Sequence, residues 1–204
     1  MIVYRLGVFL ARIWLILSGC RIIGKENIPA SGPLLVIANH TSFADPVLLA
    51  AAFPQHITFI AKEEFYRQSF TKWLFGLLGA VFLNKEESDL SALRSSMKLL
   101  KEGRIVAIFP EGRRNRDQVI SEFMSGAGYI ALKTGVPVLP VAISNSKDMW
   151  LFWKRNIVVN IGRLLTPQAA GKIDQQQLSA LTMEFRQKVT DLYIINTSLS
   201  KKNH

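Results

Sequence analysis

The sequence LLVIANHTSFADP, at residues 34–46, joins an uninterrupted apolar run to a cluster that contains a base, an acid and hydroxyl groups. Residues 34–38 are all apolar, which is typical of a strand that is buried on both faces. Pro46 suits the first position of a helix, so we expect a helix over residues 47–53 with Asp45 as its N-cap. The stretch therefore predicts a buried strand, a turn and a helix, as in an α/β fold.

His40 lies in this turn, and Asp45 follows it within the same stretch. The chain has three histidines, and only His40 has a carboxylate close by in a predicted turn. A carboxylate bonded to an imidazole fixes its tautomer and stabilises the imidazolium formed when the ring accepts a proton. On one continuous helix the two side chains would point apart, so their pairing requires the turn. Either the two residues form a catalytic dyad with His40 as general base, or Asp45 only caps a helix.

The alternation of strands and helices continues along the chain. The run 136–143 contains two prolines, which favours an edge or irregular strand. The other strands are continuously apolar, so both faces of their sheet should be covered. We expect an α/β fold in a single domain, with a mostly parallel central sheet flanked by helices. The further strands are predicted at residues 57–61, 79–85, 104–109 and 157–161, and the further helices at 88–102, 123–134 and after Asp174.

Basic residues follow two of these predicted strands. Lys85 ends the strand at 79–85, and the segment PEGRRNR occupies residues 110–116. Arg113 and Arg114 could present guanidinium groups to a phosphate while Glu111 holds them in place. Ligands of α/β sheets collect where strands end, so we expect these residues and His40 to converge on one cleft.

The composition is both apolar and basic. The 204 residues fit one domain, 49% of them are hydrophobic, and the formal net charge is +10. Such a protein suits an anionic partner, and its abundant Leu, Phe and Trp favour a membrane surface over nucleic acid. One cysteine, Cys20, excludes an internal disulfide, and three scattered histidines give no zinc-type cluster.

The N-terminal segment, residues 2–17, is apolar except for Arg5 and Arg12, which fall on one side of a helix. A spanning helix needs about 20 mostly apolar residues and tolerates a central arginine poorly. We therefore expect a membrane-surface helix whose arginine stems extend towards the headgroups, with a membrane-associated unit at 1–20 and the main domain at 21–200. Alternatively, LSGC at 17–20 resembles a bacterial lipobox with Cys20 as the lipidated residue, although Arg12 interrupts the apolar core of such a signal.

Two aromatic segments, at residues 65–78 and 150–153, have basic residues beside them. An aromatic and basic composition is typical of contact with lipid headgroups. Large aromatic residues also fill protein cores. Both interpretations stay open for these segments.

Taken together, four segments resemble the motifs of the glycerolipid acyltransferases typified by 1-acyl-sn-glycerol-3-phosphate acyltransferase. NHTSFAD at 39–45 is similar to the H-x4-D motif of that family, and GKENIP at 24–29 precedes it at the usual place. Residues 79–85, FPEGRR at 109–114 and VPVLPV at 136–141 resemble the second, third and fourth motifs. The sequence departs from the family with Lys85 in place of arginine, Arg113 in place of threonine, and Met124-Ser125 where a lysine often precedes the glycine.

The resemblance implies direct acyl transfer. His40, oriented by Asp45, would remove the proton from the free hydroxyl of 1-acyl-glycerol 3-phosphate, and that hydroxyl would attack the thioester of acyl-CoA or acyl carrier protein to give phosphatidic acid. The acyl donor is a substrate, and no cofactor or metal is expected. The expected partners are the membrane surface and anionic lipids, at the cytoplasmic face of the cell membrane, and not nucleic acid. The substrate-binding residues implied are Asn39, Lys85, Glu111, Gly112, Arg113 and Arg114.

Other functions fit part of the pattern. Within the family, the acceptor could be glycerol 3-phosphate, another lysophospholipid or a lyso-aminolipid. Ser42 suggests a Ser–His–Asp acyl-enzyme, but a nucleophile two residues from its base is poorly placed. A function of a different class is non-catalytic binding of anionic lipid. It would not explain why a base, a carboxylate and phosphate ligands occur together.

Overall fold

The computed structural model describes residues 2–62, 76, 81–83, 89–115, 117, 119–150 and 156–201. Within this part of the chain, a seven-stranded sheet has the order β1-β7-β6-β2-β5-β3-β4. β6 and β7 are antiparallel, and the other neighbouring strands are parallel. The strands are β1 Arg21–Ile23, β2 Leu34–Ala38, β3 Ile57–Lys62, β4 Val81–Leu83, β5 Ile105–Ile108, β6 Val138–Ser144 and β7 Val158–Ile161.

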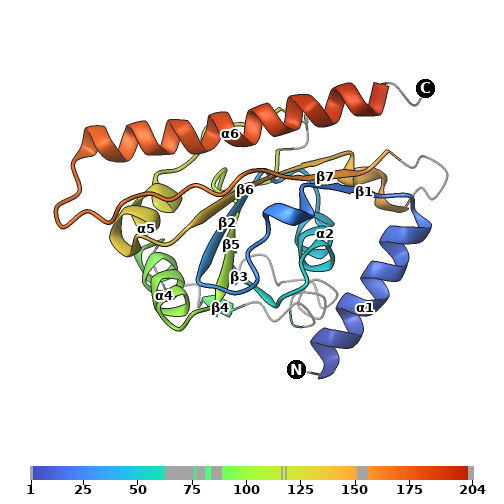
Figure 1. The fold of residues 1–204 in the computed structure, drawn as a ribbon, viewed down its shortest axis with the longest axis horizontal. Coiled ribbons are helices and arrows are strands. Elements are labelled where there is room, and N and C mark those ends of the chain that lie inside the picture. The colour runs from blue at the N-terminus through green and yellow to red at the C-terminus, as the bar shows by residue number, and fades with distance from the viewer. Residues whose placement is uncertain are drawn as a thin grey trace.

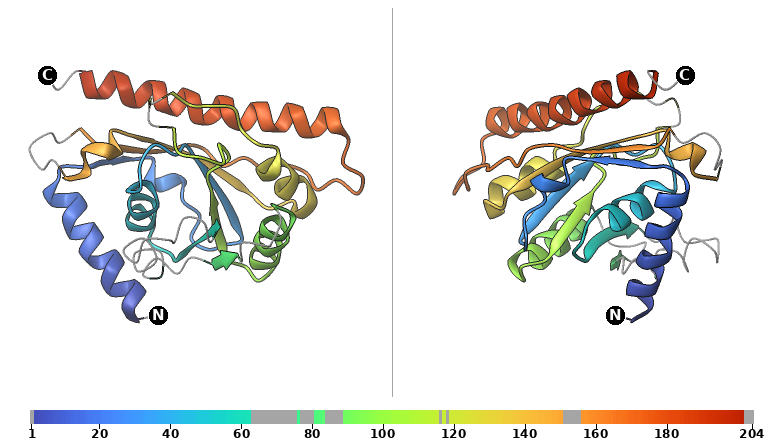
Figure 2. Two further views of the ribbon diagram at one scale, coloured as in Figure 1. Left: turned by 180° about the vertical axis from the view of Figure 1, so that it is seen from behind. Right: turned by 45° about the vertical axis from the view of Figure 1, so that its right-hand side comes forward.

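Helices cover both faces of the sheet (Figure 1 and Figure 2), as continuously apolar strands require. Alternate side chains of β2 serve two cores: Leu34 and Val36 pack with α1 and α2, whereas Leu35 and Ile37 pack with α4, α5 and α6. The predicted α/β fold with a mostly parallel sheet flanked by helices is confirmed. The helices are α1 Ile2–Leu17, α2 Asp45–Ala52, α4 Asp89–Lys101, α5 Gly126–Thr134 and α6 Gln175–Lys201, with short 3-10 helices η1 Lys25–Asn27 and η3 Ser146–Trp150.

The prediction that residues 136–143 form an edge or irregular strand is wrong. β6 lies inside the sheet between β2 and β7, and its residues are buried throughout. Pro140 is tolerated there because the residue beside it is Gly162, which lies one residue beyond the end of β7. The carbonyl of Pro140 accepts a hydrogen bond from the Gly162 N–H. A proline costs little where its missing N–H has no strand residue opposite.

Helix boundaries agree with the sequence at most ends, with two corrections. α2 begins at Asp45 with Ala44 as its N-cap, so Asp45 is not the cap. α5 begins at Gly126 and not at residue 123. The helix predicted after Asp174 is α6, and Asp174 Oδ1 accepts a capping hydrogen bond from the Gln176 N–H at 3.1 Å.

The N-terminal segment forms the expected helix, α1, which packs on α2 and buries Val8 and Leu15. Arg12 does not extend away from the protein as predicted: its Nη2 donates to Phe53 O at 2.6 Å and its Nε to Ala51 O at 3.2 Å. A cation at these carbonyls stabilises the C-terminal end of α2. The opposite side of α1 exposes apolar residues, namely Leu6, Phe9, Leu10, Ile13, Ile16 and Leu17.

None of the described helices has the length and apolar character needed to span a bilayer. The aromatic segments at 65–78 and 150–153 fall almost entirely outside the described residues, as do Lys85 and its neighbours. The interfacial position of α1 and the domain boundary near residue 20 stay predictions.

Candidate active site

The end of β2 is fixed to β6 by the side chain of Asn39. Its Nδ2 donates to Ile143 O at 2.9 Å, and its Oδ1 accepts from the Ile143 N–H at 2.8 Å. Asn39 is completely buried. Both ends of the amide are thus engaged with the sheet, which gives Asn39 a structural role; its binding of substrate stays a prediction.

The turn after β2 brings His40 and Asp45 together. Asp45 Oδ2 accepts hydrogen bonds from His40 Nδ1 at 2.9 Å and from the N–H groups of Thr41 at 2.7 Å and Ser42 at 2.8 Å. The Asp45 side chain is 0% exposed and that of His40 is 17% exposed. Because a carboxylate oxygen accepts, Nδ1 carries the hydrogen, and in the neutral form of the imidazole Nε2 then has the lone pair. Asp45 therefore caps the turn that precedes α2 and orients the imidazole at the same time.

The loop after β5 holds His40 from the other side. β2 and β5 are parallel neighbours with Ile37 opposite Ile108, so their carboxyl ends meet at one edge of the sheet. The His40 N–H donates to Glu111 Oε1 at 2.7 Å, and His40 O accepts from the Asn115 N–H at 2.8 Å. The imidazole stacks on Phe109, with centroids 4.2 Å apart and planes 19° apart. The predicted convergence of His40 with the arginine loop is confirmed.

Glu111 is buried and holds two segments with its two oxygens. Oε1 accepts from the main chain of His40, and Oε2 accepts from the N–H and the hydroxyl of Ser121. Its carboxylate therefore shapes the site through main-chain contacts, which differs from the expected pairing with the loop arginines. Gly112 follows at a φ of 66°, and a Cβ there would also collide with Met124 Sδ. This position therefore favours glycine.

The two loop arginines differ in their surroundings. The guanidinium carbon of Arg114 lies 3.4 Å from the centroid of the Phe43 ring, a close cation–π contact. Phe43 belongs to the turn between His40 and Asp45, so this contact places Arg114 beside the pair. Arg113 is exposed. The third predicted phosphate ligand, Lys85, lies beyond the end of β4 and outside the described residues.

Several residues that contribute to this geometry were not predicted. Phe109 stacks on the imidazole, Asn115 and Ser121 hold the loops, and Phe43 supports Arg114. Burial raises the pKa of Tyr193 of α6, and the negative charges of Asp45 and Glu111 raise it further. The phenol thus stays neutral near the two carboxylates. Among these residues, Phe43 and Phe109 had a signal in the sequence, because they lie inside the segments that resemble the first and third motifs.

The fold and the site together define an α/β protein with a carboxylate-oriented imidazole at the carboxyl edge of parallel strands, which is where such enzymes place a general base. Comparison with known proteins agrees with this class. Residues 19–144 match the model of the family described as Acyltransferase. The chain belongs to the acyltransferase family, and it is an O-acyltransferase.

The similar proteins include bacterial enzymes with curated names. The chain is 33% identical over 177 residues to the 1-acyl-sn-glycerol-3-phosphate acyltransferase of Borreliella burgdorferi, covering 85% of this chain and 70% of that protein. It is 29% identical over 181 residues to the Bacillus subtilis protein of the same name, covering 86% and 88%. Among solved structures, the LPA acyltransferase PlsC from Thermotoga maritima has a TM-score of 0.65 and 27% identity, covering 93% of this chain and 78% of that chain.

Proposed function

We propose that the protein transfers a fatty acyl group from acyl-CoA or acyl carrier protein to the free hydroxyl of 1-acyl-glycerol 3-phosphate, which gives phosphatidic acid. The observation that carries the proposal is the bond between His40 Nδ1 and the buried Asp45 carboxylate. The names of the relatives from Borreliella burgdorferi and Bacillus subtilis favour this acceptor over other lysolipids.

In the proposed mechanism, His40 Nε2 accepts the proton of the acceptor hydroxyl while the oxygen attacks the thioester carbonyl. Asp45 holds the ring in the tautomer that leaves Nε2 unprotonated, and its negative charge stabilises the imidazolium. The C–S bond of the tetrahedral intermediate then breaks, and the imidazolium returns the proton to the departing thiolate. The thioester supplies the activated acyl group, so the reaction needs no cofactor.

Phosphate recognition is assigned to Arg114 and Arg113, with Lys85 as a third ligand from outside the described residues. The contact with Phe43 fixes the plane of the Arg114 guanidinium beside the dyad. Bidentate hydrogen bonds to phosphate form in that plane, so a fixed plane reduces the entropy lost on binding. Glu111 and Gly112 would contribute by shaping the loop and not by contacting the phosphate.

The exposed apolar side of α1 supports a position at the membrane, where the lipid substrate resides. Six large apolar residues gather there, while Val8 and Leu15 attach the helix to the domain. An apolar helix side on a protein of net charge +10 suits an anionic bilayer surface. We place the enzyme at the cytoplasmic face of the cell membrane, with α1 lying in the interface.

A direct assay tests the proposal. Purified protein is incubated with palmitoyl-CoA and separate acceptors: 1-acyl-glycerol 3-phosphate, glycerol 3-phosphate, other lysophospholipids and a lyso-aminolipid. Lipid mass spectrometry should find phosphatidic acid as the main product, and none with His40→Ala. A main product from another acceptor would replace the proposed substrate, and turnover by His40→Ala would remove the general base.

The Ser42 acyl-enzyme alternative has its own test. Ser42 Oγ accepts from the Ala44 N–H at 3.2 Å, a bond within the turn that does not prepare a nucleophile. Intact-mass analysis of the protein with palmitoyl-CoA alone should show no acyl adduct. A stable adduct that disappears in Ser42→Ala would overturn direct transfer.

A further inference from the structure

The main chain of His40 depends on a loop that is itself held from outside. Both polar main-chain groups of His40 bond to the loop after β5, the N–H to Glu111 Oε1 and the carbonyl to the Asn115 N–H. Any displacement of Glu111 or Asn115 would therefore move the imidazole relative to the acceptor hydroxyl.

Residues 119–124, which we call the strap, fasten this loop. The strap forms neither helix nor strand. Ser121 binds Glu111 Oε2 through its N–H and hydroxyl, Val119 O accepts from Asn115 Nδ2 at 2.6 Å, and the Met124 N–H donates to Pro110 O at 2.8 Å. The strap thus supports the residues that hold His40, but without ladder hydrogen bonds of its own it needs an anchor.

Arg186 of α6 supplies that anchor. Its Nε donates to Ser121 O at 3.1 Å and its Nη2 to Ile120 O at 3.4 Å, so one guanidinium holds two consecutive carbonyls of the strap. Its neighbours Phe185 and Val189 are completely buried against the sheet, which fixes the helix at this point. A planar guanidinium on a fixed helix sets the position of the strap.

We propose that Arg186 and Ser121 are positioning residues for acyl transfer, which set the place of His40 through Glu111. The inference rests on the proposed function, because it assigns these residues to the same reaction. The sequence of contacts runs from Arg186 to the main chain of Ser121, from Ser121 to Glu111 Oε2, and from Glu111 Oε1 to the His40 N–H. Neither Arg186 nor Ser121 touches the reacting atoms.

Glu111 is buried, so its carboxylate needs the hydrogen bonds from Ser121 to stay in place. A buried carboxylate that loses the hydrogen bonds to one oxygen carries a large desolvation penalty and tends to rotate towards other donors or solvent. Rotation would release the His40 N–H. A displacement of about 1 Å at a reacting group can cost about a hundredfold in rate, so small movements of the strap suffice.

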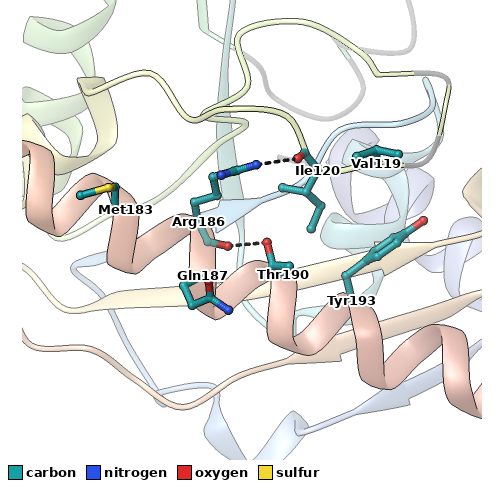
Figure 3. Close-up of a pocket in the computed structure, with 7 residues that line it drawn as sticks. All are labelled: Val119, Ile120, Met183, Arg186, Gln187, Thr190 and Tyr193. Carbon is teal, nitrogen blue, oxygen red and sulfur yellow. Dashed lines mark hydrogen bonds between the residues drawn. The ribbon is translucent and has the colours of Figure 1, made fainter.

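The surroundings of Arg186 make it suitable for substitution. Figure 3 shows Arg186 reaching from α6 to Ile120. The two residues line a groove with a volume of about 580 Å³. Arg186 is exposed, so its replacement leaves no cavity in the core. The groove is lined by Val119, Ile120, Met183, Arg186, Gln187, Thr190 and Tyr193.

The test compares Arg186→Met, which keeps the aliphatic stem, with Lys188→Met, an equal loss of charge at an exposed residue of the same helix. Steady-state rates are measured with palmitoyl-CoA and 1-acyl-glycerol 3-phosphate, and thermal unfolding confirms that each variant is folded at the assay temperature. We expect kcat of Arg186→Met to fall about tenfold with both KM values within about twofold, because the contact acts on the base and not on binding. Lys188→Met should match the wild type, and Arg186→Lys should recover part of the loss.

A double-mutant cycle with Ser121→Ala adds a second readout. If both residues act through Glu111, the double variant should have about the kcat of the worse single variant, since interacting sites are not additive. Losses that multiply, a loss confined to KM, or equal rates for Arg186→Met and Lys188→Met would overturn the inference while the proposed function stands. Wild-type protein that acylates none of the acceptors would instead overturn the proposed function.

Discussion

Replacing Asp45 with asparagine separates the observed role of this side chain, capping the turn, from its proposed role, stabilising the imidazolium of His40. Oδ2 accepts all three hydrogen bonds, whereas Oδ1 is buried and has no hydrogen-bond partner. An asparagine carbonyl can take the place of Oδ2 and keep the same donors. Its NH2 then takes the place of Oδ1, where an unsatisfied buried group costs about 1–3 kcal/mol. We expect Asp45→Asn to fold, with a lower free energy of unfolding.

The effect on catalysis should be much larger than the effect on folding. Two unit charges about 4 Å apart attract by about 4 kcal/mol at an effective dielectric constant of about 20, which corresponds to about a thousandfold in rate. The His40 side chain is 17% exposed, so solvent screens part of this attraction. We therefore expect kcat of Asp45→Asn to fall by about a hundredfold to a thousandfold. The rate of acyl transfer is measured from the release of free CoA thiol as palmitoyl-CoA is consumed.

The control for this variant is Asp174→Asn, which makes the same chemical change at the exposed start of α6. Asparagine is as good an N-cap as aspartate, so both stability and kcat should stay close to those of the wild type. If folded Asp45→Asn retained kcat within about threefold of the wild type, the charge of Asp45 would have no part in catalysis, and the residue would be a turn cap only.

Three further experiments test the proposed phosphate site, the proposed membrane contact of α1 and the thiol of Cys20. Arg114→Ala should raise the acceptor KM about 10- to 100-fold, the effect of losing a charged hydrogen bond, with the exposed Arg163→Ala as control; an unchanged KM would remove Arg114 from the phosphate site. Leu10→Glu should reduce sedimentation with anionic liposomes at least tenfold, because it removes a leucine whose burial in the bilayer surface contributes about 1.5–3 kcal/mol. The control is Met183→Glu on α6, which should bind liposomes like the wild type. Leu10 is 57% exposed and Met183 is 65% exposed. Burial raises the pKa of Cys20 to about 12, so the unreactive thiol form dominates at pH 8, and iodoacetamide should modify the native protein far more slowly than the denatured protein by intact mass. Equal sedimentation of both glutamate variants, or equal alkylation of both protein states, would contradict these two predictions.

Substitution is a sharper test of α1 than deletion of the segment. Removing residues 1–18 would also remove Val8 and Leu15 from the core and Arg12 from the end of α2. A truncated protein that failed to bind liposomes could simply have unfolded. Leu10 contributes to the exposed side only, so its effect reports on membrane contact.

Six of the seven described strands and the histidine–aspartate pair were predictable because their signals are local, whereas the short strand β1 was not predicted. Residues 34–38 are apolar without interruption, and this pattern requires cover on both faces wherever the strand lies. His40 and Asp45 share one turn, so the approach of their side chains depends on a few dihedral angles. The place of β6 inside the sheet was not predictable in this way, because Pro140 is acceptable only where β7 happens to end opposite it.

The roles of Asn39 and Glu111 show a second limit of the sequence. Asn39 lies in the segment that resembles the H-x4-D motif, and Glu111 lies in the segment that resembles the third motif. Both turn their polar atoms towards the protein, Asn39 to Ile143 and Glu111 to the His40 main chain and to Ser121. The identity of a polar residue next to a reactive one does not tell which way its side chain points. That direction is set by partners about 10 to 100 positions away along the chain, which only the fold brings near.

The pairing of β2 with β5 explains why one stretch could decide so much. Two parallel neighbours deliver their following loops to one edge, so the His40 turn and the arginine loop meet without any further element between them. Each loop then completes the other: Phe43 of the turn stacks on Arg114, and Phe109 of the loop stacks on His40. Because the contacts are reciprocal, a change in either loop should alter both the proposed base and the proposed phosphate site. The strap and Arg186 contact this shared unit from outside, so in the proposed arrangement a residue of α6 affects the chemistry of His40.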